Sequence, residues 1–316
     1  MTAAAFCIVG LGAHARTKIV PAIAASGGRL AAAVTSSADA AGAARSFQSL
    51  DGALAALPHK TVFFLATPPA LHAEQASRIL SAGFDAIIEK PAFISLEEAK
   101  RVTALSSAQG PLLVEAFMYR HTRLFERLLE FWRDNANTVT SVSLRFVIPQ
   151  MPPGTFRSRL DIASSSLFDI GCYPLSLLQA LKIDANGLAI TRVDNVGDPD
   201  RERIEMTGTV EGRAVFVEAG VGPAYVNEAR FRRADDSVIF TPLFYGRPGS
   251  RTIAGGAAMQ TLEDGNAFEA MLSVPRFQWL ETQLERNRAM VYQAARLETL
   301  GIELSALRNN TLLRNP

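Results

Sequence analysis

The first 35 residues constrain the fold more than any other part of the sequence. The continuous apolar run Ala5–Val9 predicts a buried strand, and the segment Gly10–Ala15, with the sequence GLGAHA, follows it directly. This segment has the form G-x-G-x-x-A, with a helix expected from about residue 13 to 25 and a second strand over residues 29–35. In that context Gly10 permits a tight turn, Gly12 lets a pyrophosphate approach the backbone, and Ala15 keeps the helix close to its strand. The amino terminus of the helix faces the phosphates, so the segment predicts a dinucleotide-binding turn.

Strand-like and helix-like patterns alternate through the first 120 residues. Apolar runs predict strands at 5–9, 30–35, 61–66, 85–89 and 112–116. Alanine-rich or amphipathic stretches predict helices at 13–26, 38–46, 50–57, 70–82 and 95–108. Alternation with short connections predicts a doubly wound parallel sheet, and we assign residues 1–120 to a Rossmann domain of the α/β class.

The pattern changes after residue 120. Helices are expected at 122–134 and 167–181, a strand at 138–148, a Pro/Gly-rich loop at 149–161, alternating strands over 186–262, and helices at 266–286 and 288–307. Runs of strands with few helices predict an α+β domain built on a largely antiparallel open sheet, over residues 121–316. An open sheet face suits assembly into a homodimer or homotetramer.

Composition excludes several classes of protein. The chain has 316 residues and a formal net charge of +1, which gives no reason to expect nucleic acid or a membrane surface as a partner. No apolar run reaches the length of a membrane span, and no basic residue precedes the first apolar stretch, so we expect no signal peptide. Cys7 and Cys172 are the only cysteines, which fits a reducing cytoplasm. The four histidines lack the spacing of metal ligands, and we expect no metal.

A lysine ends the strand predicted at residues 85–89. Pro91 cannot donate a ladder hydrogen bond, so the strand stops and Lys90 lies at its carboxyl end. Open α/β sheets bind their ligands at that edge, and a partly desolvated lysine there can hold or pass a proton. A surface lysine leading into the next helix explains these residues equally well.

A second group of reactive side chains lies in the segment Ser164–Leu175, with the sequence SSSLFDIGCYPL. Asp169 and Tyr173 are four residues apart and share a helix face, where a phenol beside a carboxylate can protonate a forming alkoxide. Gly171 costs about 1 kcal/mol against alanine within a helix, which a closely packed ligand or backbone would explain. The alternative is structural: Ser166 and Asp169 have the S-x-x-D spacing of a helix start, and Tyr173 suits a core.

Taken together, these segments resemble the family of glucose–fructose oxidoreductase, inositol dehydrogenase and MocA (Gfo/Idh/MocA). The matching segments occur in the family's order and spacing: Gly10–Ala15, Thr67-Pro68 with His72, Ala82–Pro91, Glu115–Arg120 and Asp169–Tyr173. The resemblance implies an NAD(P)-dependent oxidoreductase acting on a sugar, a polyol, a sugar nucleotide or a related diol. It also implies that Lys90 lies beside nicotinamide and substrate, with an often cis bond to Pro91. Asp169 and Tyr173 match the family's D-x-x-x-H/Y pair, which orients the substrate and supplies the acid/base group.

Twelve residues are expected at the cofactor. They are Gly10, Gly12, Ala13, His14, Ala15, Ser36, Ser37, Thr67, Pro68, His72, Glu89 and Lys90. The second strand ends in hydroxyl side chains without a carboxylate at the usual ribose position, and Asp39 lies slightly beyond. Hydroxyls with a nearby arginine, here Arg16 or Arg45, can accept a 2′-phosphate, so the pattern favours NADP over NAD. For His72, a helix-capping or packing role is as well supported as a place beside the cofactor.

The expected chemistry is hydride transfer between nicotinamide and a carbon that bears oxygen. In reduction, Tyr173 protonates the forming alkoxide while Lys90 stabilises its charge, and Asp169 binds a substrate hydroxyl or orients Tyr173. A phenol holds its proton near neutral pH, which favours carbonyl reduction. Arg120 and Arg157 are candidates for an anionic or polyhydroxy substrate, or are ordinary surface residues.

Two other functions stay open. Residues Ser164–Ser166 stand where the family commonly has a glycine-rich run, and serine cannot adopt every backbone conformation of glycine. A non-catalytic protein that senses NAD(P) or a sugar is therefore an alternative, as is an oxidoreductase of trans-dihydrodiols or small dicarbonyls.

Overall fold

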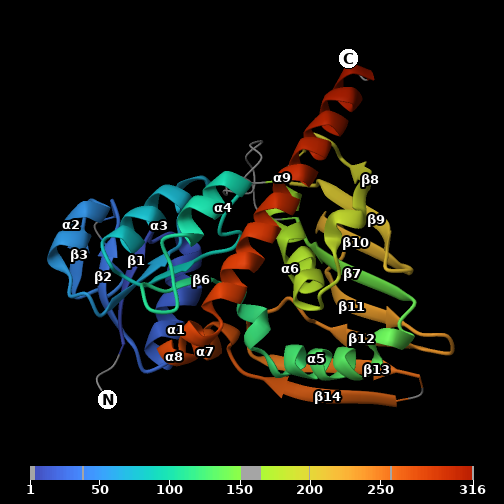
Figure 1. Cartoon of the computed structure of the whole chain (residues 1–316), viewed down its shortest axis with the longest axis horizontal. Helices are drawn as coiled ribbons and strands as arrows, with labels where there is room; N and C mark the ends of the chain where they lie inside the picture. The colour runs from blue at the N-terminus through green and yellow to red at the C-terminus, as the bar shows by residue number, and fades with distance from the viewer. Residues whose placement is uncertain (1–3, 38, 151–164, 199, 257, 315–316) are drawn as a thin grey trace. The chain divides into compact units, whose positions relative to one another are not determined.

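The structure is a computed structural model that describes residues 4–37, 39–150, 165–198, 200–256 and 258–314 (Figure 1). The chain divides into two compact units. The first comprises Met1–Met118 and Phe268–Ala294, and the second comprises Tyr119–Ala267 and Ala295–Pro316. Residues 268–294, which the sequence-based division at residue 120 assigns to the second domain, therefore return to the first unit.

A parallel sheet forms the centre of the first unit. Its six described strands are β1 (Ala5–Val9), β2 (Arg29–Val34), β3 (Arg45–Phe47), β4 (Thr61–Leu65), β5 (Ala86–Ile88) and β6 (Leu113–Glu115). They lie in the order β3-β2-β1-β4-β5-β6, and every neighbouring pair is parallel. The order reverses at β1 and β4, which makes their carboxyl ends the expected ligand edge of a doubly wound sheet. The predicted Rossmann sheet is confirmed.

Short helices connect these strands. They are η1 (Ala15–Ile19), α1 (Val20–Ala25), α2 (Leu50–Ala56), η2 (Pro69–Leu71), α3 (His72–Ser81) and α4 (Leu96–Thr103). The predicted start of α4 is confirmed, because the Ser95 hydroxyl accepts a hydrogen bond from the Glu98 amide at 3.2 Å. The carboxyl-terminal part of the chain adds α7 (Ala267–Leu272), α8 (Arg276–Glu281) and the beginning of α9 (Gln283–Arg314). Met290 and Ala294 of α9 belong to the apolar core around the sheet.

Two helix predictions are wrong. The alanine-rich residues 38–46 form no helix in their described part, because Asp39 accepts a hydrogen bond from the Ala41 amide at 2.8 Å and Ala41 and Gly42 have φ of 51° and 79°. This turn leads into β3 instead, since side-chain hydrogen bonds of aspartate compete with helix formation. The helix expected at 266–286 is divided into α7, α8 and α9, with Pro275 at the amino-terminal cap of α8.

A mixed, mostly antiparallel sheet forms the second unit. Its described strands are β7 (Ser141–Ile148), β8 (Leu188–Asp194), β9 (Arg203–Val210), β10 (Arg213–Val221), β11 (Val226–Arg232), β12 (Ser237–Thr241), β13 (Gly249–Gly255) and β14 (Ala258–Asp264). Their order is β14-β13-β12-β11-β7-β10-β9-β8. β7 and β10 are parallel, whereas the other described neighbours are antiparallel, so the predicted α+β architecture is confirmed.

Helices cover one face of this second sheet. The described helical elements of the unit are η3 (Met118–His121), α5 (Arg123–Asn135), η4 (Ala136–Thr138), η7 (Leu167–Gly171), α6 (Cys172–Ala180), η8 (Ala185–Gly187) and the later part of α9. Phe131 of α5 packs against Phe231 and Phe240 of the sheet, with ring centroids 5.6 and 5.5 Å apart. Alternation along the strands places polar side chains on the opposite face. Among the described residues, no helix is long and apolar enough to cross a membrane.

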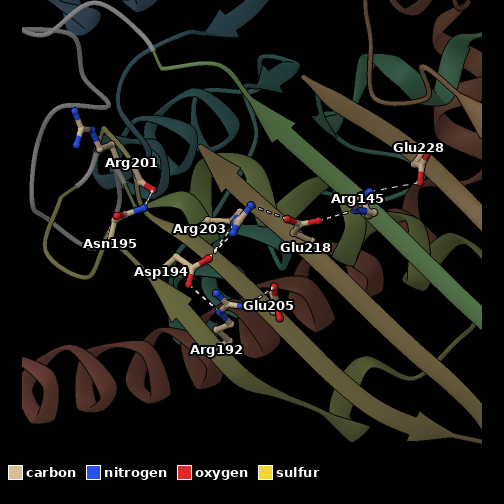
Figure 2. Close-up of polar contacts among 9 residues, drawn as sticks. All are labelled: Arg145, Arg192, Asp194, Asn195, Arg201, Arg203, Glu205, Glu218 and Glu228. Carbon is tan, nitrogen blue, oxygen red and sulfur yellow. Dashed lines mark hydrogen bonds and ion pairs between the residues drawn. The ribbon is translucent and has the colours of Figure 1, made fainter. Parts of the chain in front are cut away.

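Charged side chains form a ladder on that opposite face (Figure 2). Glu218 of β10 is only 4% exposed and lies between two arginines, with Arg145 Nε at 2.6 Å and Arg203 Nη1 at 3.2 Å from its oxygens. Arg203 also pairs with Asp194 of β8 at 2.5 Å. The ladder crosses the strands because Arg145, Glu218 and Glu205 are register partners.

Candidate functional site

Gly10 makes the turn at the carboxyl end of β1. Its φ is +89°, a conformation that other residues rarely adopt, and its amide donates to the Val34 carbonyl at 3.1 Å. A Cβ added at Gly10 would lie 2.7 Å from Thr67 Cγ2 and 3.0 Å from the Thr67 amide nitrogen. The turn therefore depends on glycine, because the loop after β4 passes directly beside it.

Gly12 and Ala13 form the exposed part of the same turn. No described atom lies within 4 Å of a Cβ built at Gly12, and both residues are exposed to solvent. Ala15, by contrast, is 1% exposed and fixes the start of the helix against the sheet. The amides of a helix's first turn lack partners within the helix and point outwards. This arrangement fits a pyrophosphate that approaches the backbone at Gly12.

Arg16 reaches the hydroxyl-rich end of β2. Its Nη2 lies 3.2 Å from Ser37 Oγ, and its Nη1 donates to Asp39 Oδ2 at 2.6 Å. A hydrogen bond from the Ala41 amide, reinforced by the Arg16 guanidinium, lowers the pKa of Asp39. Of the two arginines expected near a 2′-phosphate, Arg16 is therefore beside Ser37. Arg45 instead donates to the Ala56 carbonyl at 3.0 Å and lies over the Phe47 ring.

Glu89 connects the dinucleotide turn to Lys90. Its carboxylate is largely buried and receives hydrogen bonds at both oxygens: His14 Nε2 lies 2.9 Å from Oε1, and the Lys90 amide donates to Oε2 at 3.3 Å. His14 is itself held from the other side by Phe268 of α7, whose ring it meets edge-on at 5.7 Å. Lys90 lies two residues after β5 and is half-buried, and its bond to Pro91 is cis, as the resemblance implies.

His72 lies beneath this edge of the sheet rather than on its surface. The ring is 0% exposed, with Nε2 2.8 Å from the Thr67 carbonyl and Nδ1 3.1 Å from the Pro91 carbonyl. Burial lowers the pKa of His72, so the neutral imidazole is favoured. His72 thus ties the loop after β4 to the loop after β5, which agrees with the packing alternative. Thr67 is further held by its hydroxyl, 2.6 Å from Gln75 Oε1, next to Pro68.

The second unit presents Asp169 and Tyr173 on consecutive turns of the helical segment η7–α6. Both side chains are mostly buried, at 8% and 7% exposed. The Tyr173 ring lies among Phe146, Tyr119 and Phe244, with centroids 5.2 to 5.9 Å away. This aromatic surrounding fixes the ring, as the core alternative requires, and is equally suited to hold a phenol in one orientation.

The start of this helix differs from the predicted cap. In the described structure Ser166 makes no side-chain cap bond; its hydroxyl donates to the Glu202 carbonyl at 2.6 Å instead. Ser165 is 2% exposed, and its hydroxyl has no partner among the described residues. The atoms nearest to a Cβ at Gly171 lie at ordinary contact distances, the closest being Leu167 Cδ1 at 3.4 Å, so the expected close approach of another backbone is absent from the described structure.

The two arginines proposed for substrate lie in different situations. Arg120 is turned into the second unit, where it donates to the Ser176 carbonyl at 2.5 Å and to Gln179 at 3.2 Å. Arg157 and Ser164 lie outside the described residues. Around Arg120, Tyr119 donates to or accepts from Ser176 at 2.7 Å, and burial raises the pKa of its phenol.

Two residues with roles at this edge were not predicted. Glu115, at the end of β6, accepts a hydrogen bond from the Ala92 amide at 2.8 Å and so holds the loop that follows Lys90. A carboxylate at the end of a predicted parallel strand was the signal that could have identified it. Phe268 is distant in sequence from His14, and no local pattern points to their contact. Among the described residues, no group of three histidine, cysteine or acidic side chains is placed to hold a metal.

Comparisons with known proteins agree with this geometry. Residues 5–117 match the model of the oxidoreductase family with an NAD-binding Rossmann fold, GFO_IDH_MocA. A dTDP-3,4-didehydro-2,6-dideoxy-alpha-D-glucose 3-reductase from Streptomyces violaceoruber is 30% identical over 260 residues, which cover 78% of this chain and 75% of that protein. The chain belongs to the Gfo/Idh/MocA oxidoreductase family.

Other relatives match less of their length or only the fold. The enzyme of the same name from Actinomadura kijaniata is 28% identical over 190 residues, and the chain spans 56% of it. A crystal structure of aldose-aldose oxidoreductase from Caulobacter crescentus has a TM-score of 0.80 at 19% identity, covering 96% of this chain and 98% of that one. A 3-ketoreductase from Actinomadura kijaniata, in complex with NADP and TDP-benzene, has a TM-score of 0.75 at 19% identity, covering 95% and 97%.

Family membership confirms the oxidoreductase class and the nicotinamide dinucleotide cofactor that the sequence predicts. The residues of the first unit also fit that group: an open backbone at Gly12, a helix amino terminus, and Arg16 beside Ser37.

Proposed function

We propose that this protein reduces a carbonyl carbon of a sugar or sugar nucleotide with NADPH. One observation carries the proposal: Lys90 lies two residues after β5, at the sheet edge where Gly10 and Gly12 form the dinucleotide turn, and Glu89 links that lysine to His14 of the turn. The name of the relative from Streptomyces violaceoruber, a keto-sugar 3-reductase, supports the substrate class.

The bound nicotinamide supplies the hydride to the carbonyl carbon. As the carbonyl oxygen gains charge, Tyr173 donates its phenolic proton to it, which leaves an alcohol and a phenolate. The ammonium of Lys90 stabilises the negative charge on the oxygen and then on the phenolate. Asp169, one helical turn from Tyr173, binds a substrate hydroxyl. The aromatic rings around Tyr173 hold the phenol in one orientation and exclude water from it.

Arg16 supports the choice of NADP over NAD. Its guanidinium lies 3.2 Å from Ser37 Oγ, where the ribose of the adenosine half is held in doubly wound folds. Arg16, which is paired with Asp39, would hold a 2′-phosphate there, and the Asp39 side chain is 75% exposed. The serine hydroxyls Ser36 and Ser37 then complete the phosphate site.

Turnover of two variants tests the proposal. NADPH oxidation is followed with a panel of dTDP- and UDP-linked keto sugars, free aldoses and dicarbonyls, and NADP+ reduction is followed with trans-dihydrodiols. Lys90→Met and Tyr173→Phe should each lose at least about a hundredfold in kcat, within the range of a general acid–base group. Both should bind NADPH with an affinity close to that of the parent protein. Cofactor binding without turnover in the parent would instead favour a sensor, and turnover confined to dihydrodiols or dicarbonyls would replace the substrate class.

We further propose a homodimer formed through the open face of the second unit. Phe216 is half-buried and lies in one row with Ser143 and Thr207, next to the charged ladder of Glu218 and Arg145. The charged side chains on this face are paired with each other within the chain, so a second copy can cover the face without burying an unpaired charge. Phe216→Glu should convert the dimer to a monomer in analytical ultracentrifugation. A protein that is monomeric before the substitution would contradict this assembly.

The two cysteines support a reducing compartment. Cys7 and Cys172 are both buried and free, and burial raises the pKa of the Cys7 thiol to about 12. Such a thiol is inert and has no need of a disulfide, which fits the proposed cytoplasmic location.

A further inference from the structure

The first unit has a cavity at the edge of its sheet opposite to the dinucleotide turn. Its volume is about 120 Å³. Phe6, Val62, Ala86 and their neighbours line it from the amino-terminal halves of β1, β4 and β5, and Met271 closes it from α7. In a parallel sheet the amino ends of the strands lie opposite to the carboxyl ends, so this cavity is separate from the site of Gly10 and Lys90.

The walls of the cavity are apolar and well ordered by packing. Phe6, Ile87 and Val114 are 3%, 7% and 1% exposed, and Met271 is fully buried. Water within such an apolar lining finds few hydrogen-bond partners, so its displacement by an apolar molecule is favourable. The cavity is partly open to solvent, and its volume and lining fit a benzene-sized molecule.

The charged side chains at the cavity define the charge of its ligand. Among the described lining residues these are Asp85 and Arg276, which pair with each other at 2.7 and 3.1 Å. Asp85 also accepts a hydrogen bond from the Leu112 amide at 2.8 Å, and Arg276 donates to the Gly110 carbonyl at 3.1 Å. Because both charges are satisfied within the protein, nothing at the cavity favours an ion. The ligand that fits is neutral and apolar.

Helix α8 provides an entrance to this cavity. None of its described residues is buried, and Phe277 is 59% exposed. Arg276, at the first position of α8, holds the helix to Asp85 and Gly110. Because the cavity is partly open to solvent, a small molecule can reach it beside this exposed helix.

Helix α7 connects the cavity to the cofactor turn. Met271 of α7 forms part of the cavity wall, and Phe268, one turn earlier, meets the His14 ring at 5.7 Å. His14 in turn binds Glu89, which holds the Lys90 amide. A molecule that contacts Met271 in the cavity can therefore shift α7, and α7 also positions His14 through Phe268.

We propose that this cavity binds a small neutral apolar molecule, of the size of a benzene ring, and that its occupation changes cofactor affinity through α7. The first part is independent of the proposed function, whereas the second rests on cofactor binding at the Gly10–Ala15 turn. Filling the cavity with a larger side chain should have the same effect as the ligand.

The test uses benzene as a probe of the 316-residue chain. At about ten times its dissociation constant, benzene should raise the melting temperature by roughly 2–4 °C. Val274→Phe and Val62→Phe, which enlarge two half-buried lining residues, should abolish that rise. Val226→Phe is the matched control, because it makes the same change at a half-buried position of the second unit and should respond like the parent.

The coupling is read from NADPH titrations with and without benzene. The dissociation constant should change at least about threefold in the parent and in Val226→Phe, and should not change in Val274→Phe. An equal response of all variants, or no rise in melting temperature in the parent, would overturn the ligand site. A rise in melting temperature with an unchanged NADPH affinity would overturn the coupling. If NADPH did not bind at all, the melting data would still decide the cavity, while the proposed function would fail.

Discussion

Two glycines of the dinucleotide turn should respond to the same substitution in opposite ways. At Gly10, alanine must adopt a φ of +89°, which costs about 1–2 kcal/mol for a residue with a Cβ. The new Cβ also lies 2.7 Å from Thr67 Cγ2, 3.0 Å from the Thr67 nitrogen and 3.1 Å from the Ala66 carbonyl carbon. Two of these are backbone atoms of the loop after β4, and such overpacking costs about 1–3 kcal/mol. Gly10→Ala should therefore lower the free energy of unfolding by about 2–5 kcal/mol.

At Gly12 the fold should tolerate the change and the cofactor should not. No described atom lies within 4 Å of the new Cβ, and the backbone is outside the left-handed region. Gly12→Ala should therefore change the free energy of unfolding by less than about 1 kcal/mol. The Cβ occupies the space through which a pyrophosphate reaches the backbone, so NADPH affinity should fall at least about tenfold, or about 1.4 kcal/mol.

Urea denaturation followed by circular dichroism gives the stability of each variant, and nicotinamide fluorescence gives the cofactor affinity. The two variants separate folding from binding, because Gly10→Ala should lose stability in the urea assay, whereas Gly12→Ala should lose only cofactor affinity in the fluorescence assay. If Gly12→Ala bound NADPH as tightly as the parent, the turn would not be the pyrophosphate site. If Gly10→Ala were as stable as the parent, the packing of this turn against Thr67 would be incorrect.

Three further predictions concern single side chains. Burial lowers the pKa of His72, so below about pH 6.5 the unfolded chain binds a proton at this residue and the folded chain does not. The free energy of unfolding should therefore fall as pH falls, by up to about 1.4 kcal/mol per pH unit. His72→Gln should lack this part of the pH dependence in urea titrations at pH 7 and pH 5. Arg16→Ala should weaken NADPH binding at least about tenfold and leave NADH affinity unchanged, and an equal loss for both would refute the phosphate site. Asp264→Ala leaves Arg251, 1% exposed, as an uncompensated buried charge and should cost about 3–5 kcal/mol. As a control, Glu130→Ala removes one partner of an exposed ion pair and should lower the free energy of unfolding by less than about 1 kcal/mol in the same urea titrations.

The Rossmann sheet was predictable because its signals are local. An apolar run followed by Gly10, and a run ended by Lys90 and Pro91, each occupy fewer than about ten residues, and their strand ends meet at one sheet edge in a parallel fold. The same reasoning placed Asp169 and Tyr173 on one helical face. Strand alternation also sufficed to predict the second sheet, since one of its faces is buried.

The predictions that failed concern segments where a local hydrogen bond competes with helix formation, or contacts between residues far apart in the sequence. Residues 38–46 have a helix-forming composition, but the Ala41 amide donates a hydrogen bond to the Asp39 carboxylate, and this favours a turn that helix propensities do not predict. The return of residues 268–294 to the first unit brings Phe268 to His14, a contact between residues more than 250 positions apart. Likewise, the sequence named both Arg16 and Arg45 for the phosphate, and only the turn geometry after β2 separates them.

The central claim is that the Gly10–Ala15 turn binds a nicotinamide dinucleotide that serves a Lys90-dependent reduction. Fluorescence titration of the purified protein with NADPH and with NADH tests it most directly. The account predicts saturable binding with a clear preference for NADPH, retained in Lys90→Met and weakened in Gly12→Ala. Binding of neither dinucleotide, or binding that Gly12→Ala leaves unchanged, would contradict it.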